Sequence, residues 1–441
     1  MVTELEATLT KLQSDYFVAA DLDSMSKRQI FSDIAREIEN NRDGLRQLIV
    51  SEVKLTEQDT TKEIDRAIAT FLMAKTHADA LTDTLAEKGD KIIRERRLAR
   101  GPLLAITPFS SPLSSPAHKI STGLLASTSV LFKPSPLAAQ SGRALYDLIH
   151  KACGNRLVYF TDQEDEQTLN QVTSDDRIGI ISFTGSYITG QKIIKSGGVK
   201  KYHMELTGGN SPVIFAPDFK QYDDQLAERL VEGIVAKNGQ RCVSIKHIFI
   251  PAERINFVTE LRSKLQLVKS TGRLGPLITA DYARSSADKV KKILEFAPHV
   301  ETLLELKVDG AHISPAMYAV SGFHSDWVKQ ILCFDLPGPI VFVHLYDGQL
   351  GYQEVLGTIK RDYINSGIQL SIYVAKQASM RSLAKDLLWG GIIFNDLPTF
   401  RHAQMSFGGF GKAGLGKEGF SETLIQYTDP QTIVYPKQFT F

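Results

Sequence analysis

Short apolar runs alternate with amphipathic stretches along most of the sequence after Gly101. This pattern constrains the fold more than any other feature of the sequence. The first series of apolar runs lies at 103–106, 129–132, 156–160 and 178–183. Stretches with helical spacing separate them, at about 114–126, 136–152 and 187–196. Strands that alternate with helices of this length predict a doubly wound parallel sheet, so we expect an α/β fold.

A second series of the same kind follows and predicts a second α/β domain. Its strands are expected near 213–215, 245–250, 339–343, 370–374 and 391–395. Its helices are expected at about 222–237, 252–266, 281–296 and 377–388. A helical segment over about 25–85 precedes both series, and 425–441 is interpreted as a β arm that pairs with another segment or with another subunit.

Composition narrows the class of protein. A chain of 441 residues has room for two or three domains. Lys and Arg number 51 and Asp and Glu number 50, without a basic block, so nucleic acid is not expected as a partner. Glu4 and Glu6 stand where a secretory signal needs apolar residues, and no stretch is long and apolar enough for a membrane span. We therefore expect a cytoplasmic enzyme without a membrane partner.

The three cysteines, Cys153, Cys242 and Cys333, are far apart and odd in number, so neither a disulfide framework nor a zinc site is predicted. Cys242 follows a helical stretch and precedes a strand, at a junction between the two predicted domains where a ligand could reach a thiol. On spacing alone, a structural thiol remains the commoner interpretation, and we apply that interpretation to Cys153 and Cys333.

Two strand ends in the first series could hold phosphate or ribose groups. Phe183 to Ser186 close a strand and open a helix, where backbone N–H groups and a hydroxyl could bind a pyrophosphate. Lys133 also ends a strand and could hold a ribose hydroxyl or a phosphate. A simple turn and a solvated strand-end lysine are the alternatives.

Several short strings occur in one order along the chain. They are TPFSSP at 107–112, KPS at 133–135, FTGS at 183–186, EL at 205–206 with GGNSP at 208–212, GQRC at 239–242, LGPL at 274–277, GP at 338–339, ND at 395–396, and FGG at 407–409 with GLG at 414–416. Together they resemble the aldehyde dehydrogenase superfamily from about Met25 to the C-terminus. Each string alone is weak evidence, but their shared order makes chance a poor explanation.

The resemblance implies a fold and a reaction. It implies a Rossmann-like cofactor domain at 1–206 with part of an oligomerisation arm near 85–100, a catalytic domain at 207–409, and a C-terminal return with a β arm at 410–441. A small aldehyde would be oxidised to its carboxylic acid with NAD or NADP. Cys242 would be the nucleophile that forms a thiohemiacetal and then a thioester. Glu205 would be the general base that activates water to hydrolyse the thioester.

The resemblance also implies the binding residues. Lys133 and Ser135 would hold the adenosine ribose, and Ser186 the pyrophosphate. The further cofactor contacts would be Pro108, Gly185, Leu206 and, at the nicotinamide ribose, Asp335. Phe407 would line the substrate entrance. The string at 395–401 is similar to one in members that act on short hydroxylated or phosphorylated aldehydes, so Arg401 could contact an anionic substrate group, although a surface arginine is the alternative.

The most consequential departure from the family pattern is Ser110. Family members carry an asparagine there, and its amide stabilises the oxyanion of the thiohemiacetal. Loss of one such donor typically costs about 100-fold to 1,000-fold in turnover. A serine hydroxyl can still donate, so Ser110 or Ser111 could restore part of the effect.

The other departures concern the base and the cofactor. Thr207 is an extra residue after Glu205 and Leu206; a shifted carboxylate would favour acyl transfer to coenzyme A over hydrolysis. Pro136 stands where many NAD-preferring members have a glutamate, so a 2′-phosphate becomes tolerable. Asp335 is one methylene shorter than the usual glutamate, and Pro337 replaces an aromatic residue.

Family members assemble through an arm in the region of residues 85–100 together with the C-terminal strand. This segment is short and basic here, which we interpret as a solvated hairpin face, and we expect a homodimer rather than a tetramer. A catalytically impaired member that serves binding or assembly is the remaining alternative, favoured by the changes at Ser110 and Asp335.

Overall fold

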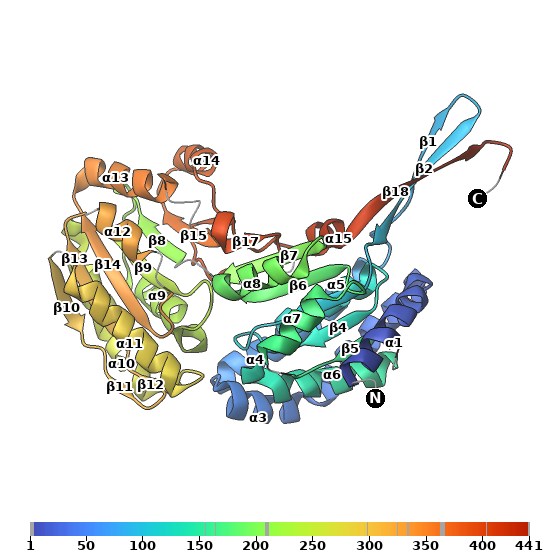
Figure 1. Cartoon of the computed structure of the whole chain (residues 1–441). Coiled ribbons are helices and arrows are strands. Elements are labelled where there is room, and N and C mark those ends of the chain that lie inside the picture. Colours follow the sequence, from blue (N-terminus) through green and yellow to red (C-terminus); the bar gives the residue numbers. More distant parts are fainter. Residues whose placement is uncertain are drawn as a thin grey trace. The chain divides into compact units, whose positions relative to one another are not determined.

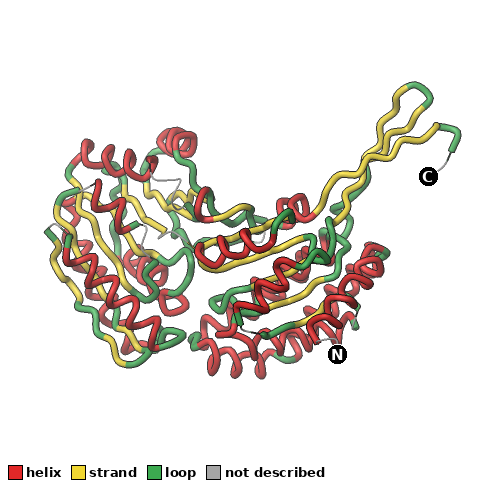
Figure 2. Tube along the Cα trace, viewed as in Figure 1, coloured by secondary structure: helices red, strands yellow, loops and turns green. Residues whose placement is uncertain are grey.

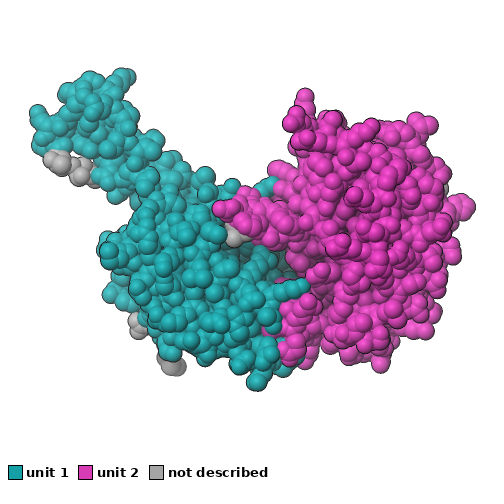
Figure 3. Space-filling model, turned by 180° about the vertical axis from the view of Figure 1, so that it is seen from behind, with its two compact units in different colours: residues 1–52, 61–205, 416–441 teal, residues 53–60, 206–415 magenta. Residues whose placement is uncertain are grey.

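The computed structural model describes residues 4–154, 156–163, 165–207, 211–297, 299–323, 325–332, 335–361, 367–402 and 404–439. The chain forms two compact units (Figure 3). Unit 1 contains Met1–Glu52, Thr61–Glu205 and Gly416–Phe441, and unit 2 contains Val53–Thr60 and Leu206–Leu415. The functional division at 206 and 409 that the sequence suggested stays a prediction, because compactness alone does not test it.

Four helices open the chain: α1 (Glu4–Ala20), α2 (Ser24–Asn40), α3 (Arg42–Val53) and α4 (Glu57–Thr76). In α2 the apolar residues Phe31, Ile34 and Ile38 recur at helical spacing and are all buried. Asp23 caps this helix by accepting a hydrogen bond from the backbone N–H of Ser26 at 2.7 Å. The predicted helical segment is therefore confirmed as far as Thr76, and α1 precedes it, but Thr84 and Leu85 at its predicted end belong to the strand β1 (Thr84–Lys88).

The sheet of unit 1 runs in the order β7-β6-β3-β4-β5. Its strands are β3 (Leu103–Ile106), β4 (Val130–Lys133), β5 (Val158–Phe160), β6 (Ile180–Ser186) and β7 (Lys201–Thr207). Strand β3 pairs in parallel with β4 on one side and with β6 on the other. The order of strands reverses between β3 and β6, and ligands of such sheets bind at the carboxyl ends of the strands beside that point.

Helices connect these strands, as the alternating pattern predicted. They are α5 (Ser114–Leu125), α6 (Ala139–Cys153), which the short 3-10 helix Pro136–Ala138 precedes, α7 (Glu166–Ser174) and α8 (Tyr187–Gly197); α15 (Phe420–Tyr427) lies near the C-terminus. Every residue of α5 is buried, which makes it the most interior helix of the unit. The first of the two predicted α/β sheets is thus confirmed.

An arm of three antiparallel strands extends from unit 1 (Figures 1 and 2). Strands β1 (Thr84–Lys88) and β2 (Lys91–Ala99) form a hairpin, and β18 (Thr428–Pro436) pairs with β2 along its whole length. The C-terminal strand therefore finds its partner within the same chain. Arg100, which directly follows β2, binds Asp429 at 2.8 Å, and both side chains are partly exposed, which is consistent with the predicted solvated face.

The sheet of unit 2 runs in the order β10-β13-β14-β9-β8-β15-β16. These strands are β8 (Ser211–Phe215), β9 (Ile245–Pro251), β10 (Val300–Leu304), β13 (Ala316–Ser321), β14 (Ile340–Tyr346), β15 (Gln369–Tyr373) and β16 (Gly391–Phe394). The helices are α9 (Asp224–Val235), α10 (Ile255–Leu267), α11 (Ala280–Glu295), α12 (Ser325–Ile331), α13 (Gly348–Arg361) and α14 (Gln377–Asp386). The minor strands are β11 (Val308–Asp309), β12 (His312–Ile313) and β17 (Gly414–Leu415).

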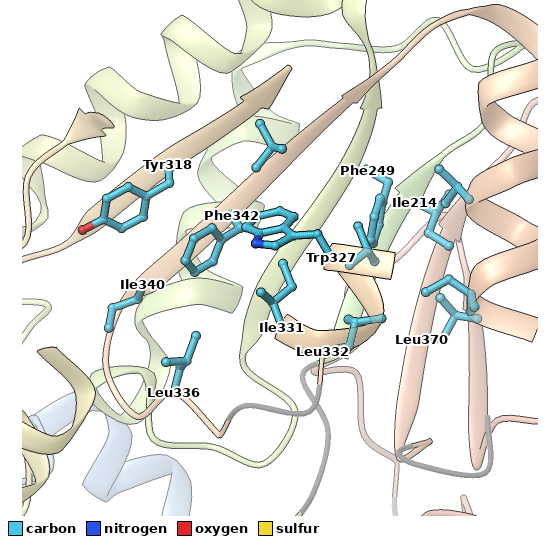
Figure 4. Close-up of a cluster of buried hydrophobic side chains, with 14 of the residues drawn as sticks. Ile214, Phe249, Tyr318, Trp327, Ile331, Leu332, Leu336, Ile340, Phe342 and Leu370 are labelled. Atoms are coloured by element: carbon cyan, nitrogen blue, oxygen red, sulfur yellow. The ribbon is translucent and has the colours of Figure 1, made fainter. Parts of the chain in front are cut away.

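Aromatic side chains fill one face of this second sheet. Figure 4 shows Phe342 and Trp327 within this core, and their rings meet edge to face with centroids 6.2 Å apart. Two histidines lie in the same region: His247 on β9 and His344 on β14 face each other, with Nδ1 of His247 3.1 Å from Nε2 of His344. Both imidazoles are buried, so a polar pair sits inside an apolar core.

Among the described residues, none of the helices has the length and apolar character needed to cross a bilayer. Within the same residues, no group of His, Cys, Asp and Glu side chains has the arrangement of a metal site.

Candidate active site

Cys242 lies in a loop of unit 2 that begins with three residues in the left-handed backbone region. Helix α9 ends at Val235, and the short 3-10 helix Ala236–Gly239 follows, with φ angles of 52° at Lys237, 57° at Asn238 and 69° at Gly239. Each non-glycine residue in this region costs about 1–2 kcal/mol. The surrounding structure must therefore hold the loop in place.

Hydrogen bonds to side chains and carbonyl groups provide this support. The amide of Asn238 donates to the carbonyls of Lys54 and Pro276, each at 2.8 Å, and accepts from the backbone N–H of Gly275 at 2.7 Å. The backbone N–H of Lys237 donates to Asp59 at 2.8 Å. The loop before the cysteine is thus fixed from several sides, which favours a defined position for the thiol.

The thiol itself is partly exposed and borders a small apolar cluster. Val243, Ile368 and Ala413 are buried in this cluster, and Cys242 and Phe407 pack against it. Cys242 and Phe407, which the sequence predicted as nucleophile and as substrate wall, are therefore brought to the same place. A partly exposed thiol beside an apolar wall suits a ligand that is mostly nonpolar at its reacting end.

A positive charge lies next to this wall. The guanidinium carbon of Arg401 is 3.8 Å from the centre of the Phe407 ring, a cation–π contact. Arg241, the neighbour of Cys242 in sequence, donates to the carbonyl of Thr399 at 3.4 Å. Arg401 and Phe407, the two residues predicted to meet the substrate, are therefore in direct contact.

Asp335, the predicted nicotinamide-ribose ligand, is exposed and lies in a loop that touches the cysteine loop through backbone atoms. The N–H of Gly338 donates to the carbonyl of Gly239 at 3.1 Å. Lys246 is buried on β9 and donates to the same carbonyl at 2.8 Å and to the carbonyl of Gly338. Burial lowers the pKa of Lys246 to about 7, against the opposing attraction of Asp335.

Glu205, the predicted general base, lies on β7 in unit 1 and is buried in a polar network. Its Oε1 accepts from the ammonium group of Lys119 at 3.2 Å, and its Oε2 accepts from the hydroxyl of Thr184 at 2.8 Å. Lys119 also donates to Ser182 at 3.0 Å. An ion pair therefore holds the carboxylate in the interior of the unit.

Two histidines surround this network. Burial lowers the pKa of His203 to about 3, with a further contribution from the nearby positive charge of Lys119. Burial lowers the pKa of His118 to about 4, partly opposed by Glu418 and Glu205. Both imidazoles are therefore neutral at pH 7, and they enclose the Lys119–Glu205 pair without adding charge. The sequence analysis did not identify Lys119 or either histidine.

The predicted cofactor residues of unit 1 gather at the carboxyl ends of its strands. Lys133 is the last residue of β4 and is buried, so the alternative of a solvated lysine is wrong. The hydroxyl of Ser135 accepts from the N–H of Leu137 at 3.3 Å, and that of Ser186 from the N–H of Thr189 at 3.1 Å at the start of α8. An ammonium group, hydroxyls and a helix N-terminus at this edge fit the phosphates and ribose of a dinucleotide.

The remaining predicted residues are placed as follows. Pro108, Ser110 and Ser111 are half-buried in the loop between β3 and α5, Gly185 lies one residue before the end of β6 against the ring of Phe183, and Leu206 is buried on β7. Burial raises the pKa of the Cys153 thiol to about 12, as suits a structural cysteine. Cys333 and the predicted motif residues Gly208, Gly209 and Asn210 lie outside the described residues.

Comparison with known proteins shows the family to which this chain belongs. The sequence model described as "Aldehyde dehydrogenase family" matches residues 4–433. The chain is 26% identical over 419 residues to a lactaldehyde dehydrogenase of Methanococcus aeolicus, covering 92% of this chain and 86% of that protein. It is also 26% identical over 422 residues to aspartate-semialdehyde dehydrogenase 1 of Pseudomonas canavaninivorans, with the same coverage.

Solved structures share the fold. The crystal structure of a glyceraldehyde-3-phosphate dehydrogenase from Methanocaldococcus jannaschii, complexed with NADP, superposes with a TM-score of 0.87 at 24% identity and covers 98% of this chain and 94% of that one. The family match spans nearly the whole chain and includes both predicted α/β domains. This chain belongs to the aldehyde dehydrogenase family and is an oxidoreductase that acts on aldehydes with NAD or NADP.

Proposed function

We propose that the chain oxidises a small aldehyde with an anionic group to its carboxylic acid, with Cys242 as the nucleophile. The observation that carries this proposal is the partly exposed thiol that shares an apolar cluster with Phe407, on which Arg401 stacks. In the first step the thiolate sulfur bonds to the carbonyl carbon, and the carbonyl oxygen becomes an oxyanion. The left-handed loop at Lys237, Asn238 and Gly239 keeps that sulfur in a fixed position.

Bound NAD or NADP would accept the hydride. Loss of this hydride from the substrate carbon converts the thiohemiacetal on Cys242 into a thioester. Lys133 and Ser135 would hold the adenosine ribose, the start of α8 at Ser186 the pyrophosphate, and Asp335 the nicotinamide ribose. Pro108, Gly185 and Leu206 would shape the rest of this cofactor site. These assignments rest on the strand-end positions and on the family pattern.

Ser110 would stabilise the oxyanion in place of the family's asparagine, together with the backbone N–H of Cys242. A hydroxyl donates one hydrogen bond, and its side chain is shorter than that of asparagine. We therefore propose a reduced stabilisation of the oxyanion, with Ser111 as the second possible donor.

Glu205 would accept the proton of the water that hydrolyses the thioester. In the structure Lys119 and Thr184 bind both carboxylate oxygens inside unit 1. Because these hydrogen bonds must break before the carboxylate can accept a proton from water, we propose that hydrolysis of the thioester is the slow step. The same observation favours a second candidate activity, transfer of the acyl group to coenzyme A.

The substrate class follows from the guanidinium group of Arg401. A guanidinium binds a carboxylate, phosphate or sulfonate through charge-assisted hydrogen bonds, and Phe407 would cover the carbon chain. Relatives with such substrates in their names support this choice, among them the aspartate-semialdehyde dehydrogenase and a sulfoacetaldehyde dehydrogenase of Neptuniibacter caesariensis, 24% identical.

We also propose a homodimer in the cytoplasm. The outer edge of β18 has no partner strand among the described residues, and Val434 on it is exposed, so a second copy could extend this sheet. Neither Cys153 nor Cys242, the two described cysteines, forms a disulfide bond, which suits a reducing compartment. Light scattering of the purified protein measures the assembly.

A spectrophotometric assay tests the activity. The protein is mixed with NAD or NADP and with short aldehydes that carry a carboxylate, phosphate, sulfonate or no charge, with and without coenzyme A. We expect reduced nicotinamide with the anionic aldehydes and none for the Cys242→Ala variant. Absence of signal across the panel would overturn the proposal in favour of a binding or assembly protein, and a rate that requires coenzyme A would select acyl transfer.

A further inference from the structure

The structure brings a buried lysine between two loops that the proposed reaction needs. Lys246 follows Cys242 by four positions and lies on β9 between the core residue Ile245 and the buried His247. A buried ammonium group costs several kcal/mol unless hydrogen bonds compensate it. Its bonds go to the backbone carbonyls of Gly239 and Gly338, one in each loop.

These two loops meet without side chains between them. A Cβ atom on Gly239 would lie 2.3 Å from the carbonyl carbon and oxygen of Gly338, so the backbones are in direct contact. The only direct backbone hydrogen bond described between the two glycines runs from the N–H of Gly338 to the carbonyl of Gly239. Lys246 adds a second bridge, which ties the two carbonyl groups to one ammonium group.

Each loop carries one of the groups that hydride transfer must align. The first loop leads in three residues to Cys242, which would hold the substrate carbon. The second contains Asp335, which would hold the nicotinamide ribose. Hydride transfer needs the reacting atoms about 3–3.5 Å apart, and a displacement of about 1 Å can cost about 100-fold in rate.

We infer that Lys246 is a positioning residue for hydride transfer, fixing the Cys242 loop against the Asp335 loop through the carbonyls of Gly239 and Gly338. This inference rests on the proposed function. Lys246 touches neither the substrate nor the cofactor in this account; it acts through the two backbone segments. A lysine suits the task because its terminal nitrogen donates three hydrogen bonds as an ammonium group and two as a neutral amine, enough for both carbonyls in either form.

The test is the Lys246→Met variant, which keeps the length of the side chain and removes every donor. Lys264→Met, on α10 of the same unit, is the matched control because that lysine binds only Asp224 among its described ion-pair partners. The first turnover is followed by stopped flow with an ordinary and a 1-deuterated aldehyde, and rates are divided by the number of Cys242 thiols that iodoacetamide labels in folded protein.

For Lys246→Met we expect the rate of the first turnover to fall roughly 30-fold to 100-fold. The deuterium isotope effect on the rate of the first turnover should rise, while the aldehyde concentration that half-saturates this rate should change less than about 3-fold. Lys264→Met should match the wild type. An unchanged rate per labelled thiol, an unchanged isotope effect, or a loss confined to the half-saturating concentration would overturn the inference, because a purely structural role predicts fewer folded molecules and no change in the step.

A second variant decides the question if Lys246→Met does not fold. The hydroxyl of Ser286 donates to the carbonyl of Pro337 at 2.7 Å and so supports the second loop without touching the first. Ser286→Ala should slow the first turnover about 3-fold to 10-fold with a higher isotope effect, and equality with the wild type would overturn the inference. A wild-type protein that oxidises no aldehyde would instead refute the proposed function, and the inference with it.

Discussion

The ammonium group of Lys119 lies 3.2 Å from Oε1 of Glu205, and both side chains are buried in unit 1. Removal of one partner leaves the other charge without compensation in the interior. Lys119→Met should therefore lower the free energy of unfolding of unit 1 by about 3–5 kcal/mol, measured by urea denaturation.

Lys192→Met is the control for this prediction, because Lys192 pairs with Glu166 on the surface, where such a pair contributes about 0–1 kcal/mol. The double variant Lys119→Met/Glu205→Gln should recover part of the lost stability. A loss at Lys119→Met no larger than that of the control would contradict the role of the buried ion pair.

Gly239→Ala should remove activity, because the new methyl group would strike the backbone of Gly338 and the residue would have to keep a φ of 69°. Gly272 has the same φ and open space around its Cα, so Gly272→Ala should cost only the backbone strain of about 1–2 kcal/mol. Thermal unfolding and turnover of the two variants separate steric contact from backbone strain. Equal behaviour would show that the contact with Gly338 is unimportant.

The His247–His344 pair predicts loss of stability in acid. Burial lowers the pKa of His247 to about 3 and holds that of His344 well below its ordinary value. The unfolded chain binds protons at these sites below about pH 6.5 and the folded chain does not, so stability is full above pH 6.5 and falls toward pH 3. Each site contributes up to about 1.4 kcal/mol per pH unit.

The variant His247→Phe/His344→Phe tests this, since phenyl rings suit the aromatic neighbours Phe249 and Phe342. We expect its unfolding temperature to change less between pH 7 and pH 5 than that of the wild type. His312→Gln, at an exposed position, is the control. An unaltered pH dependence in the double variant would argue against the pair as the source.

Ser110→Asn should raise the rate of the first turnover by about 10-fold or more, because an amide restores the donor that family members use for the oxyanion of the thiohemiacetal. The measurement is the stopped-flow rate of the first turnover with the best aldehyde of the panel, because the proposed slow hydrolysis would set kcat. If this rate falls instead, the serine is adapted to this substrate and the site is not impaired.

Arg401→Met should raise KM for anionic aldehydes roughly 10-fold to 100-fold, the equivalent of about 1.5–3 kcal/mol for hydrogen bonds to a charged group. Neutral aldehydes of the same length should be oxidised as before. Arg381→Met, at an exposed position on α14, is the control. Equal effects on charged and neutral aldehydes would remove Arg401 from substrate recognition.

Apolar periodicity predicted most strands of both sheets, since buried parallel strands are continuous apolar runs between amphipathic helices, but it did not predict β10 and β13 of unit 2. A search for continuous apolar runs missed β7, because this strand instead alternates polar residues (Lys201, His203 and Glu205) with apolar ones (Tyr202 and Met204). It also missed α13, whose glycines at 351 and 357 weaken the helical pattern. Local signals fail where tertiary packing decides the conformation.

The residues of the candidate site were likewise predictable only where they are marked by a local sequence pattern. The motif around Cys242 could be predicted because its residues are adjacent in sequence, and Phe407 and Arg401 because they belong to another short string. Lys119 and Lys246 could not be predicted: their partners Glu205 and Gly338 lie 86 and 92 positions away, and nothing local marks a lysine as buried. Only the fold brings each ammonium group to its acceptor.

The most direct test of the account is the covalent state of Cys242 during turnover. Protein, oxidised cofactor and an anionic aldehyde are mixed, and the reaction is quenched in acid within the first turnover. The protein is then digested, and the masses of the cysteine-containing peptides are measured by mass spectrometry. The account predicts the mass of an acyl group on the peptide that contains Cys242, and none on that of Cys153. An unmodified Cys242 peptide while reduced nicotinamide accumulates would contradict it.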